Sequence, residues 1–243
     1  MNSTTTAQLL DVNKSFYQTF AEQFSATRRR LQPGVQRILE KFSSQAHILD
    51  LGCGHGELAL SLSRSGHQGI YVGIDLSSHL LERARQLVAR QNFSAHFIQA
   101  DLSTPGWENQ LPILAFDIIL AFAVLHHLPG NPLRLQVLSS SHHLLSPDGR
   151  FIHSVWQFLS SPRMRSRIQP WETIGLSDED VDPGDYLLDW RHGGLGYRYV
   201  HHYSTAELAS LAAATGFSIQ DTFISDGENG KLGLYQVWTK TRN

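Results

Sequence analysis

Residues 47–56 of the chain read His-Ile-Leu-Asp-Leu-Gly-Cys-Gly-His-Gly, an apolar run that ends in three closely spaced glycines. The apolar run predicts a short buried strand. Glycine lets the backbone turn sharply and approach a ligand closely. The Gly-x-Gly-x-Gly spacing is shorter than the Gly-x-Gly-x-x-Gly fingerprint of dinucleotide-binding proteins. We therefore expect a ligand-binding loop between this strand and a helix over 56–65.

Strand and helix patterns alternate after this loop as far as residue 155. A capping box at 204–207 then begins a last helix. Alternation of this kind is typical of a parallel sheet covered by helices on both faces. The prediction is an α/β fold with a doubly wound, mostly parallel, seven-stranded, Rossmann-like sheet. Further strands are expected at 70–75, 95–100, 116–121 and 150–155, helices after Ser77 and Pro132, a turn at 147–149, and a final hairpin of 217–223 with 232–238.

The segment 156–203 interrupts this alternation. It contains Pro, Gly, Trp and Arg without a clear period, and it is too long for an ordinary connection. We interpret it as a substrate cap inserted between strands five and six of a single domain that spans 1–243. The remaining parts are N-terminal helices over the site (1–45), the cofactor-binding core (46–155) and the final helix with its hairpin (204–243).

The composition is that of a globular protein that can bury a full core, with 41% hydrophobic and 17% charged residues. The 20 Lys and Arg residues face 22 Asp and Glu, so a nucleic-acid substrate would need a local basic patch or a partner protein. Cys53 is the only cysteine, which excludes an internal disulfide or a cysteine-based zinc cluster, and the scattered histidines predict no metal site. The polar first residues and the lack of a long apolar run predict a cytoplasmic location and no membrane association.

Acidic residues stand at the ends of three predicted strands. Asp50 lies just before the glycine loop, Asp75 ends the second strand and Asp101 follows the third. The carboxyl ends of parallel strands meet at one edge of a sheet, where α/β folds bind ligands. An acid about twenty residues after the glycines is where nucleotide-binding folds accept hydrogen bonds from ribose hydroxyls. The pattern therefore predicts a cofactor that contains a ribose.

The loop and the acids resemble those of the class I S-adenosylmethionine-dependent methyltransferases, and the resemblance covers residues 46–238. It implies that Asp50 and the glycines line the methionine part of the cofactor, that Asp75 binds the ribose and that Asp101 faces the adenine. Cys53 has no basic neighbour in sequence that would lower its thiol pKa, so we expect packing rather than nucleophilic chemistry. A nucleotide-binding fold of another class, such as a dehydrogenase, is the alternative. The expected cofactor-binding residues are Asp50, Gly52, Cys53, Gly54, Gly56, Asp75, Leu76, Asp101, Leu102, Ala121 and Ala123.

Four further segments resemble the tRNA methyltransferases that esterify wobble 5-carboxymethyluridine. They are residues 24–28, 123–127, 184–190 and 198–203, the last followed by a Glu-Leu pair at 207–208. The chain departs from that family's pattern at Val200, where a second Tyr is expected, and at Leu188-Asp189, where Val-Pro is expected. The resemblance implies a tRNA substrate and a small zinc-binding activator protein as a partner.

The chemistry of the methyl acceptor decides which side chains are needed. A carboxylate is ionised near pH 7 and needs no general base, only cations or hydrogen-bond donors that orient it. A guanidinium can supply two parallel hydrogen bonds, whereas aromatic rings can stack on a base. A hydroxyl or amine acceptor would need a base, for which His127 is the candidate. The expected catalytic residues are Arg28, His127, Arg198 and Tyr199, and the expected substrate-binding residues are Trp156, Trp190 and His201.

Several of these side chains also have a structural interpretation. Arg28 begins a run of three arginines that could form a solvated helix face. Arg198 could brace the cap by an ion pair, and tryptophans belong to the core more often than to a ligand site.

Three functions follow from these patterns. The preferred one is methyl esterification of a wobble-uridine carboxylate in tRNA. The second is methylation of a metabolite carboxylate or hydroxyl, and the third is a non-catalytic cofactor-binding subunit. An open groove flanked by Arg28, Arg163 and Arg198 would favour tRNA, whereas a closed pocket under 156–203 would favour a metabolite.

Overall fold

The computed structural model describes residues 1–26, 30–227 and 229–241. A seven-stranded sheet in the order β3-β2-β1-β4-β5-β10-β9 forms its centre. The first five strands pair in parallel, and β10 runs antiparallel to both β5 and β9. This confirms the doubly wound, mostly parallel sheet. The strands are β1 (Ile48–Leu51), β2 (Tyr71–Asp75), β3 (Ala95–Gln99), β4 (Phe116–Phe122), β5 (Leu145–Trp156), β9 (Phe217–Ser225) and β10 (Gly233–Lys240).

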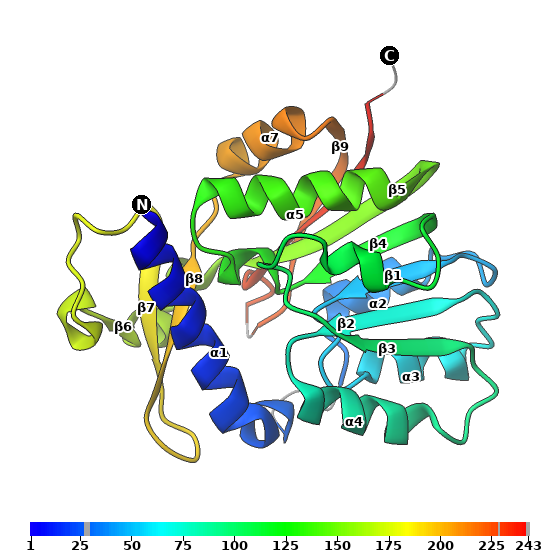
Figure 1. Ribbon diagram of the computed structural model, residues 1–243, viewed down its shortest axis with the longest axis horizontal. Helices are drawn as coiled ribbons and strands as arrows, with labels where there is room; N and C mark the ends of the chain where they lie inside the picture. Colours follow the sequence, from blue (N-terminus) through cyan, green and yellow to red (C-terminus); the bar gives the residue numbers. More distant parts are fainter. Residues whose placement is uncertain (27–29, 228, 242–243) are drawn as a thin grey trace.

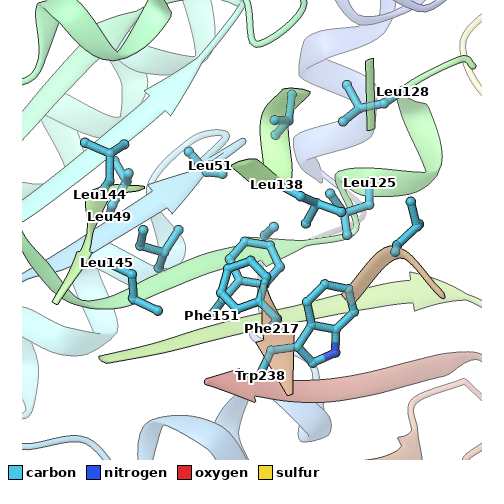
Figure 2. Close-up of a cluster of buried hydrophobic side chains, with 14 of the residues drawn as sticks. Leu49, Leu51, Leu125, Leu128, Leu138, Leu144, Leu145, Phe151, Phe217 and Trp238 are labelled. Carbon is cyan, nitrogen blue, oxygen red and sulfur yellow. The ribbon is translucent and has the colours of Figure 1, made fainter. Parts of the chain in front are cut away.

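Helices cover both faces of this sheet, with α5 and α7 on one face and α2, α3 and α4 on the other (Figure 1). Successive strand residues point to opposite faces, so Leu49 and Leu51 pack under α5 and α7 whereas Ile48 packs under α2 and α3. Figure 2 shows the core on the α5 side, where Phe151, Phe217 and Trp238 meet the leucines of β1 and α5. The helices are α2 (Pro33–Leu39), α3 (Glu57–Arg64), α4 (Ser78–Val88), α5 (Asn131–Leu144) and α7 (Thr205–Ala214), with short 3-10 helices η1 (Trp107–Gln110) and η2 (Leu125–His127).

The prediction of a separate turn at 147–149 was wrong. These residues lie inside β5, and the pairing of β4 with β5 shifts there: Phe116 pairs with Leu145, but Ile118 pairs with Arg150. The extra residues of β5 fold back locally, so that a Cβ added to Gly149 would lie 2.8 Å from Leu145 Cδ1. The turn-forming sequence therefore produces an irregularity within the strand instead of ending it.

The segment after β5 contains a second, antiparallel sheet in the order β6-β7-β8, which the irregular sequence of 156–203 did not predict. Both faces of this sheet are buried. Leu187 and Tyr199 pack with residues of α1, whereas Leu188 and Val200 pack against Phe158. Burial on both faces removes the alternation of apolar and polar residues by which a strand is recognised in sequence. The elements are β6 (Ile168–Gln169), β7 (Asp185–Trp190), β8 (Gly196–His201), α6 (Pro162–Arg165), η3 (Phe158–Ser160) and η4 (Trp171–Ile174).

The first helix, α1 (Ser3–Ala26), runs along the second sheet and contacts β8 (Figure 1). Side chains of α1 also reach the loops at the carboxyl ends of β1, β2 and β4, where they line a cavity. No helix in the described part of the chain has the length and apolarity needed to cross a bilayer.

Candidate active site

The glycine loop after β1 holds three positive-φ glycines that serve different purposes. A Cβ on Gly52 (φ +72°) would lie 2.6 Å from Val124 Cγ2, so this glycine allows the loop after β4 to come close. A Cβ on Gly54 (φ +56°) would meet no described atom within 4 Å, which leaves its backbone open to a ligand. A Cβ on Gly56 (φ +86°) would lie 2.8 Å from Ala84 Cβ, so this glycine lets α3 pack on α4.

Asp75 joins the ends of β1 and β2. Its Oδ2 accepts the Gly54 N–H at 2.9 Å and its Oδ1 accepts the Ser77 N–H at 2.9 Å. Burial raises the pKa of the Asp75 carboxyl, and the hydrogen bonds from backbone N–H groups oppose that rise. Each carboxylate oxygen can accept a second hydrogen bond, so Asp75 keeps the capacity to bind a ligand hydroxyl.

Burial changes the pKa values of Asp50 and Cys53. The Tyr71 hydroxyl donates to Asp50 Oδ2 at 2.6 Å. Burial raises the pKa of Asp50 to about 7, because the Tyr71 bond only partly offsets it and the charge of Asp75 adds to it. Burial, Asp75 and Asp50 also raise the pKa of the Cys53 thiol well above its usual range. Cys53 is therefore a packed thiol and not an activated nucleophile.

Two cavities meet at this loop. The Asp75 cavity has a volume of about 350 Å³ and extends from Asp75 and Asp101 to the loop after β4 and to α1. The Asp50 cavity has a volume of about 420 Å³ and extends from Asp50 and Cys53 to Trp156. The two share four lining residues, Gly52, Gly54, Phe122 and Ala123.

A third space, the cap cavity, has a volume of about 910 Å³ and lies between the β6-β7-β8 sheet and the loop before β10. It adjoins the Asp50 cavity, because Trp156 and Asp226 line both. Arg198 lines the cap cavity but is only 3% exposed. Its guanidinium carbon lies 4.7 Å from the ring centre of Phe16, 5.1 Å from that of Trp156 and 5.3 Å from that of Trp190. This buried cation is stabilised by aromatic faces.

Comparisons with known proteins agree with this geometry. A family model described as a methyltransferase domain matches residues 21–222, most of the chain. The chain belongs to this methyltransferase family. It is 28% identical over 209 residues to an Encephalitozoon cuniculi protein that is named as a methyltransferase. This match covers 85% of this chain and 87% of that protein. Its fold matches the crystal structure of a SAM-dependent methyltransferase from Methanosarcina mazei with a TM-score of 0.67 at 20% identity, over 88% of this chain and 99% of that one.

The methyltransferase is also 27% identical over 165 residues to the mouse tRNA (carboxymethyluridine(34)-5-O)-methyltransferase ALKBH8. That match covers 68% of this chain but only 23% of the mouse protein, so the chain corresponds to a minor part of it. The family and these relatives identify the chain as an enzyme that uses S-adenosylmethionine, rather than a dehydrogenase or a non-catalytic subunit.

The described residues fit this cofactor. The open backbone at Gly54 and the remaining hydrogen-bonding capacity of Asp75 supply a cradle and a hydroxyl acceptor at the meeting point of the two cavities. The predicted cofactor-binding residues that line the cavities are Asp50, Gly52, Cys53, Gly54, Asp75, Leu76, Asp101, Leu102 and Ala123.

Two of the residues expected at the cofactor lie outside both cavities as the described residues define them. Gly56 packs against Ala84, and Ala121 is fully buried in the core because its side chain points away from the cavity, whereas the next residue, Phe122, lines it. The sequence analysis expected N-terminal helices over the site but did not single out Tyr17, which α1 supplies to the Asp75 cavity.

The methyltransferase holds His127 in a defined tautomer. The ring nitrogen Nδ1 lies 3.1 Å from the Tyr199 carbonyl oxygen, which can only accept, so Nδ1 carries a hydrogen. The other nitrogen, Nε2, lies 2.8 Å from the Tyr17 hydroxyl and in the neutral ring accepts its hydrogen. Asn13 fixes the pair by donating to the His127 carbonyl and accepting from the Tyr199 N–H. The lone pair that a general base would use is therefore engaged with Tyr17.

The structure corrects the expectation that Tyr199 and His201 touch the acceptor. Both are buried, and they line none of the three cavities as the described residues define them. Asp185 Oδ1 accepts the Tyr199 hydroxyl at 2.7 Å and lies 2.6 Å from His201 Nδ1, and His201 Nε2 lies 2.8 Å from Glu207 Oε1. Arg134 of α5 donates to the Tyr199 hydroxyl, so this network ties the second sheet to α5 and α7.

Arg28 lies outside the described residues. Of the other residues expected at the acceptor, the structure brings Trp156, Trp190 and Arg198 together at the cap cavity, while His127 lines the Asp75 cavity.

Proposed function

We propose that this methyltransferase esterifies a carboxylate on a wobble uridine of tRNA. The observation that carries the proposal is Arg198, a buried guanidinium in the wall of a cavity that adjoins the Asp50 cavity. A cation that is removed from water and surrounded by rings attracts a carboxylate more strongly than a solvated one, because little water screens the interaction. The resemblance of four segments to the carboxymethyluridine methyltransferases and the match to the mouse enzyme support the tRNA acceptor.

The hydrogen bond between His127 Nε2 and the Tyr17 hydroxyl also supports a carboxylate acceptor. A hydroxyl acceptor must lose its proton to a base, whereas an ionised carboxylate needs none. Tyr17 occupies the lone pair of His127 that would take that proton. The site is thus better suited to align a nucleophile that is already charged.

The chain's own residues would act by binding and alignment. Asp75 and Leu76 would hold the ribose side of the cofactor, Asp101 the adenine side, and Asp50 with the glycine loop the methionine side. When bound, S-adenosylmethionine supplies an electrophilic methyl group on its sulfonium. Arg198 would orient the acceptor carboxylate beside the Asp50 cavity, with the rings of Trp156 and Trp190 around it. Alignment of this kind can supply much of a displacement's acceleration.

Arg28 stays a prediction as a second cation at the acceptor, outside the described residues. We also propose a small zinc-binding activator protein as a partner and a cytoplasmic location. The near balance of 20 basic and 22 acidic residues supports a partner, since the chain alone lacks the positive excess that holds most RNA ligands.

The test is transfer of labelled methyl groups from S-adenosylmethionine to bulk tRNA from cells that lack the gene, followed by nuclease digestion. The expected product is an alkali-labile methyl ester on a uridine. If the enzyme binds S-adenosylmethionine but labels no tRNA, with or without the zinc-binding partner, the tRNA acceptor is refuted.

A metabolite carboxylate or hydroxyl is the second candidate acceptor. The volume of the cap cavity, about 910 Å³, is within the size range of small-molecule sites and favours it. Against it, Arg163 and Arg198, two of the three arginines expected to flank an open tRNA groove, line this cavity, and Arg163 is exposed. Labelling of a small-molecule extract in preference to tRNA would select the metabolite.

A further inference from the structure

Basic side chains gather at the outer part of the cap cavity, away from the buried Arg198. We call Arg163, Arg167, Arg191 and Lys231 the outer basic cluster; all four line the cavity. The side chain of Arg191 is 63% exposed and that of Arg167 is 30% exposed, against 3% for Arg198. The cavity therefore offers positive charge at two depths, one shielded from water and one at the rim.

Asp189 holds two members of this cluster in place. Its side chain is only 2% exposed, and its Oδ2 lies 2.7 Å from Arg191 Nε and 2.6 Å from Arg191 Nη2. Its Oδ1 lies 3.4 Å from Arg167 Nη1, and its backbone N–H donates to the Arg167 carbonyl at 2.9 Å. A guanidinium has five N–H donors, so each arginine retains donors after binding Asp189. One buried carboxylate thus orients two guanidiniums and cancels only part of the cluster's charge.

This arrangement belongs to this chain rather than to the pattern it resembles. Asp189 stands where the carboxymethyluridine methyltransferases are expected to have Pro, which has no side chain that could hold an arginine. The second carboxylate in the cavity wall, Asp226, binds groups outside the cluster, since it accepts the Gly34 N–H and the Tyr235 hydroxyl. Asp189 is therefore the acidic residue that organises the rim.

We propose that the outer basic cluster, with Arg167 and Arg191 positioned by Asp189, binds phosphodiester groups of RNA next to the acceptor nucleotide. The inference rests on the proposed tRNA substrate and deepens it. Preordered guanidiniums suit phosphate oxygens, because a planar fork can donate two parallel hydrogen bonds. An exposed rim suits a chain of phosphates that continues into solvent, while the buried Arg198 suits a single carboxylate. With a net charge of −2, the protein must attract RNA through such a local patch.

The test compares the wild type with an Arg167→Gln/Arg191→Gln variant and a matched control. The control, Arg64→Gln/Arg90→Gln, removes two exposed arginines at the end of α3 and just after α4. The probe is a fluorescently labelled single-stranded RNA of anticodon-loop sequence, and its Kd is measured by anisotropy over a range of KCl concentrations.

The cluster variant should bind this RNA roughly 10-fold or more weakly, because it loses charge-assisted hydrogen bonds. The slope of log Kd against log salt should fall by about 1.4, since each lost phosphate contact on single-stranded RNA is worth about 0.7. An Arg167→Lys/Arg191→Lys variant keeps the charges and should recover most of the slope but not the full affinity. The control should keep both values, and unchanged values in the cluster variant would overturn the proposal.

The same variants separate this proposal from the proposed function. In the tRNA methylation assay the cluster variant should raise KM by a larger factor than it lowers kcat. If tRNA is methylated but KM and the salt slope do not change, the phosphate site is wrong and the acceptor stands. If the predicted loss of RNA binding occurs but no tRNA is methylated, the site stands and the acceptor is wrong. A wild type that binds no RNA at low salt refutes the site.

Discussion

A pair of glycine substitutions separates the structural and the ligand-binding roles of the loop after β1. Gly52 and Gly54 both have positive φ, so alanine at either position strains the backbone by about 1–2 kcal/mol. Only at Gly52 would the added Cβ also clash, at 2.6 Å from Val124 Cγ2, which adds about 1–3 kcal/mol of overpacking. The sum is about 2–5 kcal/mol for Gly52→Ala against about 1–2 kcal/mol for Gly54→Ala.

Thermal unfolding measures the first difference, that in stability between the two variants. In a chain of this size each kcal/mol lowers Tm by roughly 2–4 °C, so Gly52→Ala should fall clearly below Gly54→Ala. Calorimetric titration with S-adenosylmethionine measures the second difference, that in cofactor affinity. Gly54→Ala should bind the cofactor at least roughly 10-fold more weakly although it is the more stable variant, because its methyl group enters the space where two cavities meet. Equal losses of Tm, or wild-type cofactor affinity in Gly54→Ala, would refute the reasoning.

Three further outcomes are expected. Arg198→Gln should lower kcat/KM for a carboxylate acceptor by roughly 10- to 100-fold, as labelled methyl transfer would show, because it removes charge-assisted hydrogen bonds; Arg198→Lys should recover part of the loss. Tyr17→Phe should cost about 1 kcal/mol of stability in urea unfolding but leave kcat within roughly five-fold, whereas a collapse of kcat would mean that the pair with His127 moves a proton. Burial alone would lower the pKa of His201, but the bonds to Asp185 and Glu207 outweigh burial and raise this pKa. The protonated His201 therefore stabilises the fold fully below about pH 6.5, and this stabilisation is lost as the pH rises through the raised pKa. The Tm difference between wild type and His201→Gln should therefore be larger at about pH 6 than at about pH 9, and a constant difference would contradict the ion-pair assignment.

The cofactor side of the site could be predicted because it depends on local sequence. A glycine loop between a strand and a helix and acids at strand ends can be recognised residue by residue, and Asp75 and Gly54 indeed meet through a hydrogen bond. Gly56 could not be assigned in this way, because it packs against Ala84, a residue distant in sequence. Outside the site, the turn-forming residues at 147–149 became part of β5.

The acceptor side could be predicted only in part, because adjacent residues of one strand take different roles according to what packs on each face of the strand. Arg198 and Tyr199 are neighbours on β8, yet one lines the cap cavity and the other lies in the buried network of Asp185. Successive side chains of a strand point to opposite faces, and the sequence does not show which face meets α1. Tyr17 belongs to no recognisable motif, and Asp189 stands out in the sequence only as a departure from the pattern that segment 184–190 resembles.

The sequence by itself determined the alternating strands and helices of the seven-stranded sheet, the glycine loop and the acids at the carboxyl ends of β1 and β2, since these follow from backbone conformation and hydrophobic period. Only the tertiary structure decided that residues 168–201 form a second sheet with both faces buried, that α1 brings Tyr17 to His127, and that Asp189 brings Arg167, 22 residues earlier in the chain, beside Arg191. The physical reason is distance along the chain: these contacts join residues whose proximity depends on how whole elements pack, and local propensity carries no information about that packing.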